Sequence, residues 1–360
     1  MEFGLFMMPL HPPHRSYAES YDRDLDLIVR ADNLGFKEVW VGEHVTERWE
    51  NAPCPDLLLA KASAMTKNIL LGTGVNLLTL HNPVELGHRI AMLDHLTHGR
   101  LQWGIGHRAI TEDLQLFGLG SLQGDEVRER AAEALDLILE MWASEGKFSF
   151  KGKYFDIDAP ELDPIRERGL HMKPLQKPHP PIFVAASSGR SASIRTAARR
   201  GYLPMSSSGL APRFLAEHWS VIEDSAAEVG TKVNRSDWRI ARDVFIAETD
   251  DLARERARAV LGRNYIQHQL PNRANSGQIQ NAKLTPDIPD EALDVDYMME
   301  NIWIVGGPQQ CADKIRKLYN EVGGFGHLLA ITQDPDDPSW EHETLDLLKE
   351  EVAPRVADLI

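Results

Sequence analysis

The chain has 360 residues, of which 42% are hydrophobic and 26% charged, as is usual for a folded globular protein. Its net charge of −15, from 39 basic and 54 acidic residues, disfavours nucleic acid and anionic membranes as partners. No apolar run approaches the ~18 residues that span a bilayer, and residues 1–8 lack the features of a secretory signal. We therefore expect a cytoplasmic protein with a small-molecule ligand.

Cysteine usage supports the same location. Cys54 and Cys311 are the two cysteines of the chain, and they lie far apart without the spacing of a metal site. We expect two thiols, no disulfide framework and no bound metal.

Eight short apolar segments are predicted as strands, because each is bounded by turn-forming residues. In chain order they are 2–8, 38–44, 69–78, 99–106, 181–186, 202–206, 239–248 and 327–332. Apolar residues at helical spacing predict helices between them. These are 17–34, 56–66, 83–96, 125–144, 212–229 and 340–359, with others ending near 200 and 322.

The alternation of strands and helices predicts one (β/α)8 TIM barrel over residues 1–360. Two segments are expected as insertions: 145–180, which begins with a surface hairpin over 148–155, and the aperiodic polar stretch 268–300, a candidate active-site lid. A doubly wound sheet is the alternative fold, and the absence of Gly-x-Gly-x-x-Gly after the first strand counts against it.

In a parallel barrel, residues that follow the strands gather at one end. Polar residues in such positions are His11, Glu43, His44, Asn76, His107, Arg108, Ser187, Ser188 and Ser206. The strand before Glu43 and His44 ends abruptly at these two ionisable residues. His44 is therefore a candidate for catalysis, although a histidine that only hydrogen-bonds within its loop is the common alternative.

The segment Ser187-Ser-Gly-Arg-Ser-Ala-Ser193 lies between a predicted strand and a predicted helix. Small hydroxyl residues, the backbone access that Gly189 gives, Arg190 and the N–H groups of a helix start together suit a phosphate. A serine-rich helix cap without a ligand is the alternative.

Four further residues each allow two predictions. Asn76 has an amide suited to the polar edge of a heterocycle, or to holding a loop. His107 and Arg108 add positive charge near an anionic ligand, or form part of the surface. Trp49, with Glu50 beside it, covers an apolar pocket or packs under its own loop.

Several motifs resemble the bacterial luciferase-like flavin-dependent monooxygenases. They are Phe3-Gly-Leu-Phe6, Ala31-Asp-Asn-Leu-Gly-Phe36, Val39-Trp-Val-Gly-Glu-His44, Leu71-Gly-Thr-Gly74, Leu93-Asp-His-Leu-Thr-His-Gly-Arg100 and Phe117-Gly118. Within that family, Trp49-Glu-Asn-Ala-Pro-Cys-Pro55 is most similar to the oxygenating components of two-component systems that act on cyclic terpenoid ketones or alkenes.

The resemblance implies a barrel that binds FMN as FMNH2, delivered transiently by a separate NAD(P)H:flavin reductase. FMNH2 reacts with O2 in this family to a C4a-peroxyflavin, which oxygenates a small apolar substrate by Baeyer–Villiger oxidation, hydroxylation or epoxidation. His44 matches the catalytic histidine, Ser187, Ser188, Gly189, Arg190 and Ser191 match the phosphate region, and Gly74-Val75 matches a cis peptide beside the flavin ring.

Other predictions remain open on the sequence alone. His107 and Arg108 stand where many relatives have one arginine, so either is a candidate for the phosphate. His11, Glu43, Trp49 and Ser206 are expected to line the substrate pocket, and a homodimer is expected. An F420-dependent oxidoreductase and a flavin-binding protein without turnover are the alternative functions.

Overall fold

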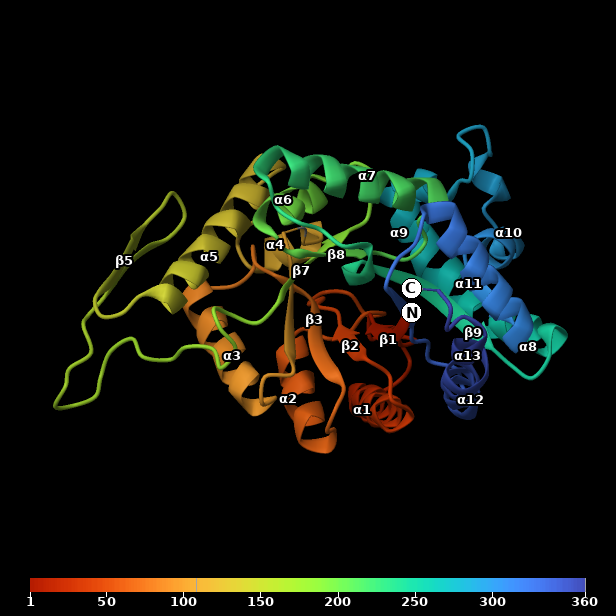
Figure 1. Cartoon of the computed structure of the whole chain (residues 1–360), viewed down its shortest axis with the longest axis horizontal. Coiled ribbons are helices and arrows are strands. Elements are labelled where there is room, and N and C mark those ends of the chain that lie inside the picture. The colour runs from red at the N-terminus through yellow and green to blue at the C-terminus, as the bar shows by residue number, and fades with distance from the viewer. Residues whose placement is uncertain (108, 360) are drawn as a thin grey trace.

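In the computed structural model, which describes residues 1–107 and 109–359, eight parallel strands close into a barrel (Figure 1). They are β1 (Glu2–Met7), β2 (Glu38–Val41), β3 (Leu70–Leu77), β4 (Leu101–Gly106), β7 (Ile182–Ala186), β8 (Leu203–Ser206), β9 (Arg239–Ile246) and β11 (His327–Ile331). Consecutive strands pair side by side, and β11 pairs with β1. Pairing of Ser206 with Ile240 joins β8 to β9 and closes the ring. The predicted (β/α)8 barrel is confirmed.

Helices surround the barrel (Figure 1). They are α1 (Tyr17–Leu34), α2 (Pro55–Met65), α3 (Pro83–Leu96), α5 (Asp125–Ala143), α6 (Ala192–Arg200), α7 (Pro212–Val229), α8 (Asp250–Ala257), α11 (Pro308–Val322) and α12 (Ser339–Leu347). Helix α1 illustrates how the sequence sets the ends of a helix. Ser16 accepts a hydrogen bond from the Glu19 N–H at its start, and Gly35 ends it in the left-handed conformation. Its stripe of Leu25, Ile28 and Ala31 is buried in the core. None of the described helices is long and apolar enough to cross a membrane.

Several shorter elements extend the barrel, and not all of them were predicted. The hairpin of β5 (Phe148–Lys151) and β6 (Asp156–Ala159) projects from the body, as Figure 1 shows. Helix α4 (Thr111–Leu116) and strand β10 (Ile304–Gly306), which pairs with the second half of β9, were not predicted. The expected final helix is divided by a π-helical turn before α13 (Ala353–Arg355). Each unpredicted element is too short to show a period.

The polar stretch 268–300 lies in a run of short helical turns rather than in an irregular loop. π-Helical turns span Arg258–Gly262 and Tyr265–Gln269, followed by α9 (Leu270–Asn275) and, after two 3-10 turns, α10 (Val295–Asn301). Tyr265 anchors the run: its hydroxyl donates to the Leu293 carbonyl at 2.7 Å, and its ring meets Trp303 edge-on. Turns of this length cannot display helical periodicity, which explains why the sequence did not show them.

The interior of the barrel is filled by large side chains. Trp40 and Phe183 are fully buried and meet edge-to-face with ring centroids 4.6 Å apart. Glycines in the neighbouring strands leave space for these rings, since a Cβ at Gly72 would collide with the Trp40 ring. Near the amino ends of the strands, Glu38 forms a buried ion pair with Arg239. This pair fills the amino end of the barrel interior, opposite the carboxyl ends at which ligands bind in barrels of this kind.

Candidate functional site

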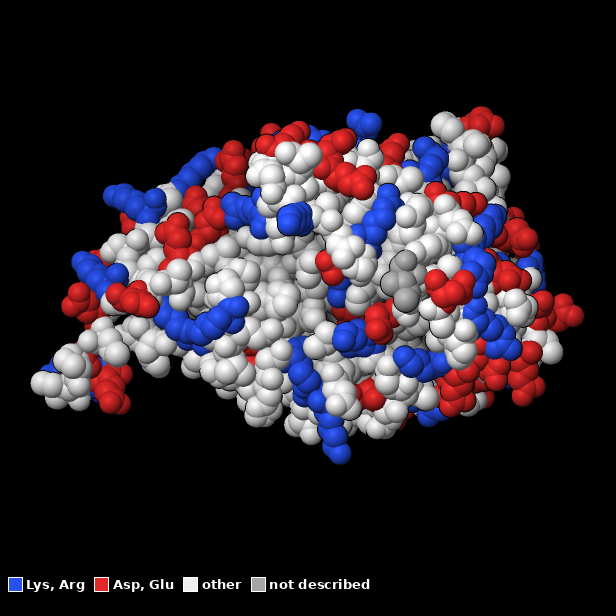
Figure 2. All heavy atoms as spheres, in the orientation of Figure 1, with Lys and Arg blue, Asp and Glu red and all other residues white. Residues whose placement is uncertain are grey.

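The predicted polar residues that the structure describes lie at or just after the carboxyl ends of β1, β2, β3, β4, β7 and β8, with Asn76 inside β3 and Ser206 the last residue of β8. The charged side chains on the face drawn in Figure 2 are of both signs and interspersed, with an uncharged area near the middle. Arg108 lies outside the described residues. Among the residues that are described, no group of three or more His, Cys, Asp or Glu side chains is arranged to hold a metal ion.

His44 lies in the loop after β2, paired with a carboxylate from the same loop. Its Nε2 is 2.9 Å from Glu50 Oε2, and its Nδ1 is 4.0 Å from Asp113 Oδ2. Burial alone lowers the pKa of His44, but the charges of Glu50 and Asp113 and the hydrogen bond to Glu50 raise it to about 9. Conversely, burial raises the pKa of Glu50, and the two histidines that contact it lower it to about 2. His44 is therefore an imidazolium paired with a carboxylate at neutral pH.

Glu50 also contacts a histidine that the sequence analysis did not identify. His268, in the turn Tyr265–Gln269, places Nε2 2.9 Å from Glu50 Oε1 and stacks on Trp49, with ring centroids 5.6 Å apart. Trp49 is half-buried. His268 follows Glu50 by 218 residues in an aperiodic segment, so no local signal pointed to it.

Glu43 and Asn76 form a buried network behind His44. Glu43 Oε2 accepts hydrogen bonds from Asn76 Nδ2 at 3.2 Å and from the Leu77 N–H at 3.0 Å, while Oε1 lies 2.6 Å from His81 Nε2. Trp103 Nε1 donates to Asn76 Oδ1 at 3.2 Å. Both ends of the Asn76 amide are thus bonded to protein groups, which is the loop-holding arrangement that the sequence left open.

The Gly74–Val75 peptide is cis, as the resemblance implied. The pairing of β3 with β4 shifts register between Thr73 and Asn76, around this peptide. A Cβ at Gly106 would lie 2.5 Å from Val75 Cγ2, so β4 approaches Val75 closely. His107, the next residue, is half-buried, and its carbonyl accepts a hydrogen bond from Thr79 Oγ1.

The backbone of the serine-rich segment 187–193 is held in place by hydrogen bonds to its carbonyl groups. Asn281 Nδ2 donates to the Ser187 carbonyl at 2.8 Å, and His218 Nε2 lies 2.5 Å from the Ser188 carbonyl. The side chains of Ser188 and Arg190 are exposed, whereas Gly189 is buried. The backbone is fixed, and polar side chains remain accessible at the start of α6.

Ser206, which is expected to line the substrate pocket, is fully buried. Its hydroxyl lies 2.8 Å from His218 Nδ1 and accepts a hydrogen bond from Trp238 Nε1. Burial lowers the pKa of His218 to about 4, so the ring is neutral. With Nε2–H donated to the Ser188 carbonyl, Nδ1 accepts from Ser206. Ser206 supports segment 187–193 from the barrel wall.

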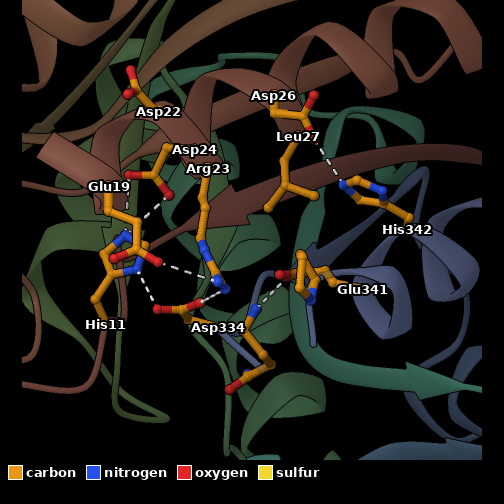
Figure 3. A pocket seen from close by; sticks show the side chains of 12 residues that line it. His11, Glu19, Asp22, Arg23, Asp24, Asp26, Leu27, Asp334, Glu341 and His342 are labelled. Atoms are coloured by element: carbon orange, nitrogen blue, oxygen red, sulfur yellow. Dashed lines mark hydrogen bonds and ion pairs between the residues drawn. The ribbon is translucent and has the colours of Figure 1, made fainter. Parts of the chain in front are cut away.

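His11 lies beside a separate cavity of about 480 Å³ between α1 and α12 (Figure 3). Its ring is buried between Asp334, 3.0 Å from Nδ1, and Asp24, 3.2 Å from Nε2. Burial lowers the pKa of His11, but the two aspartates together raise it to about 9. The backbone N–H of His11 contacts the His44 loop by donating to the Trp49 carbonyl. The lining of this cavity does not include His44.

Comparison with known proteins agrees with this geometry. The family model of luciferase-like monooxygenases matches residues 1–324. The chain is 32% identical to 2,5-diketocamphane 1,2-monooxygenase 1 of Pseudomonas putida, and the match covers 99% of both chains. It is 29% identical to limonene 1,2-monooxygenase of Rhodococcus erythropolis, and this match covers 98% of this chain and 86% of that protein. The oxygenating constituent of 3,6-diketocamphane monooxygenase of Pseudomonas putida, a type II Baeyer–Villiger monooxygenase solved with FMN, superposes with a TM-score of 0.92 at 30% identity over 98% of each chain. The chain belongs to the luciferase-like monooxygenase family, and the predicted flavin-dependent monooxygenase is confirmed.

Proposed function

We propose that this enzyme uses FMNH2 and O2 to oxygenate a small apolar ketone or alkene. The observation that carries the proposal is the His44–Glu50 ion pair at the carboxyl end of the barrel, which keeps an imidazolium at the site. The named relatives support the substrate class, because they act on diketocamphanes and on limonene.

The residues around the start of α6 fit the phosphate of FMN. Among the described residues, the side chain of Ser191 does not cap the first turn of α6, so the N–H groups there remain available to an anion. Ser187, Ser188 and Arg190 add hydroxyl donors and a positive charge, while buried Gly189 leaves room for Phe214 and Glu217 of α7. We assign the phosphate to this segment and the ring to the neighbourhood of Gly74-Val75. His107, and Arg108 outside the described residues, stay candidates for a further phosphate contact.

Reduced FMN bound there would supply the electrons that activate O2. We propose that His44 holds a proton next to the reacting atoms. Nε2 is committed to Glu50, whereas Nδ1 makes no hydrogen bond to any described residue. Nδ1 is buried 4.0 Å from Asp113 Oδ2, and the positive ring stabilises negative charge that develops nearby.

The contacts of the remaining predicted residues indicate which of them meet the substrate and which position the His44 loop. We propose that Trp49 covers the pocket, since it lies in the His44 loop against His268. Glu43 and Asn76 position the His44 loop through their mutual hydrogen bond instead of contacting the substrate. His11 fixes the junction of this loop with α1.

The partners follow from the same comparison and from the surface. The solved relative is an oxygenating constituent, so we propose that a separate NAD(P)H:flavin reductase supplies FMNH2 here by transient contact. We also propose a homodimer through α2 and α3. Leu57 and Met65 on α2 and Met92 and Leu96 on α3 are 68%, 48%, 55% and 46% exposed, an apolar area that a second copy would cover. Two unpaired thiols support a cytoplasmic location.

Product analysis tests the function. The purified protein, an unrelated flavin reductase, NADH and FMN are incubated with a bicyclic ketone or with limonene under ¹⁸O2. We expect a product that carries one ¹⁸O atom and is lost without FMN. Reduction of substrate or product without ¹⁸O, driven by reduced F420, would support the alternative cofactor, and binding of FMN without any product would support a flavin-binding protein.

A further inference from the structure

One carboxylate, that of Glu50, lies between two imidazole rings from distant parts of the chain. Oε2 is 2.9 Å from His44 Nε2, and Oε1 is 2.9 Å from His268 Nε2. Each oxygen therefore has its own histidine, so the orientation of the carboxylate toward His44 is coupled to its contact with His268. His44 belongs to the loop after β2, and His268 to the helical run that follows α8.

The hydrogen-bond pattern assigns the proton positions on His268. Asn272 Nδ2 lies 3.2 Å from His268 Nδ1, and an amide nitrogen can only donate. Nδ1 therefore accepts, and Nε2 carries the hydrogen that is donated to Glu50. The ring is only 5% exposed, and it stacks on Trp49 at an interplanar angle of 22°, which fixes its direction.

The segment that carries His268 is itself anchored to the rim of the barrel. Asn264 Nδ2 donates to Gln333 Oε1 at 2.8 Å, after β11. Arg273 donates to the carbonyls of Ser208 and Gly209, after β8. Because these anchors lie on both sides of His268, its place above Glu50 depends on the packing of the segment 264–273 against the barrel.

Several other charges surround the two histidines. Asp113 lies 4.0 Å from His44 Nδ1, and Glu47 lies 3.8 Å from His268 Nδ1. Glu47 also contributes to the raised pKa of His44, and half-buried Arg273 lies close enough to interact with Glu50. Of the charged groups that raise the pKa of His44, Glu50 has the largest effect. A change in the orientation of the Glu50 carboxylate therefore changes the pKa of His44 most.

We propose that His268 is a positioning residue for His44. It donates to Glu50 and holds the carboxylate in the orientation that pairs with His44, so the packed segment 264–273 sets the proton affinity of His44. Its importance for catalysis rests on the function proposed above, whereas the coupling itself is a property of the protein without flavin.

The test is a titration of His44 by NMR in the flavin-free protein with ¹³C,¹⁵N-labelled histidine, assigned by loss of its signal in His44→Gln. His268→Phe keeps a ring against Trp49 but loses the donor, and His268→Gln keeps a donor but loses the ring. We expect the pKa of His44 to fall by about 1 in His268→Phe, because the ion pair loosens, and to return most of the way in His268→Gln. Glu50→Gln, which removes the charge, should lower it further.

An unchanged or higher pKa of His44 in His268→Phe would overturn the proposal, and so would an equal fall in both His268 variants. Thermal unfolding of each variant shows that the comparison is between folded proteins. A second readout is the pH profile of product formation, which should shift to lower pH in His268→Phe. If the wild type forms no product, the proposed function fails while the NMR result still decides the coupling.

Discussion

His218 donates a hydrogen bond from Nε2 to the Ser188 carbonyl, 2.5 Å away, and so links the barrel wall to the segment assigned to the phosphate. Its other ring nitrogen is bonded to Ser206, which in turn accepts from Trp238. The phosphate segment is therefore held by a buried chain of neutral hydrogen bonds.

Replacing His218 should weaken FMN binding without touching the ligand. In His218→Ala the Ser188 carbonyl loses its partner, and we expect FMN affinity to fall roughly tenfold, equivalent to about 1–2 kcal/mol. Quenching of FMN fluorescence on binding measures this affinity. Because His218 is neutral above about pH 4, the loss should be the same at pH 6 and pH 8. An affinity equal to that of the wild type would contradict the assignment of segment 187–193.

Stability should depend on pH through histidines with opposite pKa shifts. His44 and His11 have pKa values raised to about 9, so the stability they contribute is fully present below their unfolded value near 6.5 and is lost as pH rises through 9. His218, lowered to about 4, acts in the opposite direction between pH 4 and 6.5. Urea unfolding should show a smaller free energy of unfolding at pH 9 than at pH 6.5. Glu50→Gln should reduce this difference, and a larger free energy at pH 9 would contradict the assigned ion pairs.

The packing of the barrel interior predicts unequal costs for two glycine substitutions. A Cβ at Gly104 would collide with the Thr73 carbonyl oxygen, and the backbone cannot move aside. Gly104→Ala should therefore destabilise the protein by about 3 kcal/mol or more, or prevent folding. At Gly87 the new Cβ meets the end of the flexible Met141 side chain, so Gly87→Ala is the matched control with a small effect. Equal melting temperatures would contradict the close approach of β3 to β4 at Gly104.

The exposed apolar side chains on α2 and α3 predict the oligomeric state. Light scattering should report a dimer for the wild type and a monomer for Leu57→Glu combined with Met92→Glu, because burying two carboxylates in an apolar interface is costly. Ile165→Glu, at a residue that is 91% exposed and belongs to neither helix, should remain a dimer. A wild-type monomer, or a dimer in the double variant, would contradict this interface.

The sequence was sufficient for the eight strands of the barrel and for the polar residues near their ends, because burial gives each of these strands an apolar run that ends where the chain turns. His44 was found in this way, since two ionisable residues follow Val41 and Gly42 directly. His268, His218 and His81 could not be found, because each reaches the site through folding of a distant segment. Ser206 and His11 were assigned to the pocket from their positions near strand ends, whereas their buried contacts with His218 and Asp334 could not be predicted.

The most direct test of oxygen activation at His44 mixes the anaerobic protein with FMNH2 and then with O2 in a stopped-flow instrument, and compares wild type with His44→Ala. We predict that oxidised FMN forms more slowly on the wild type than from free FMNH2, that His44→Ala shortens this delay, and that its yield of oxygenated product falls by about 10²-fold or more. Oxidation on the wild type at the rate of free FMNH2, or an identical time course and yield in His44→Ala, would contradict this role of His44.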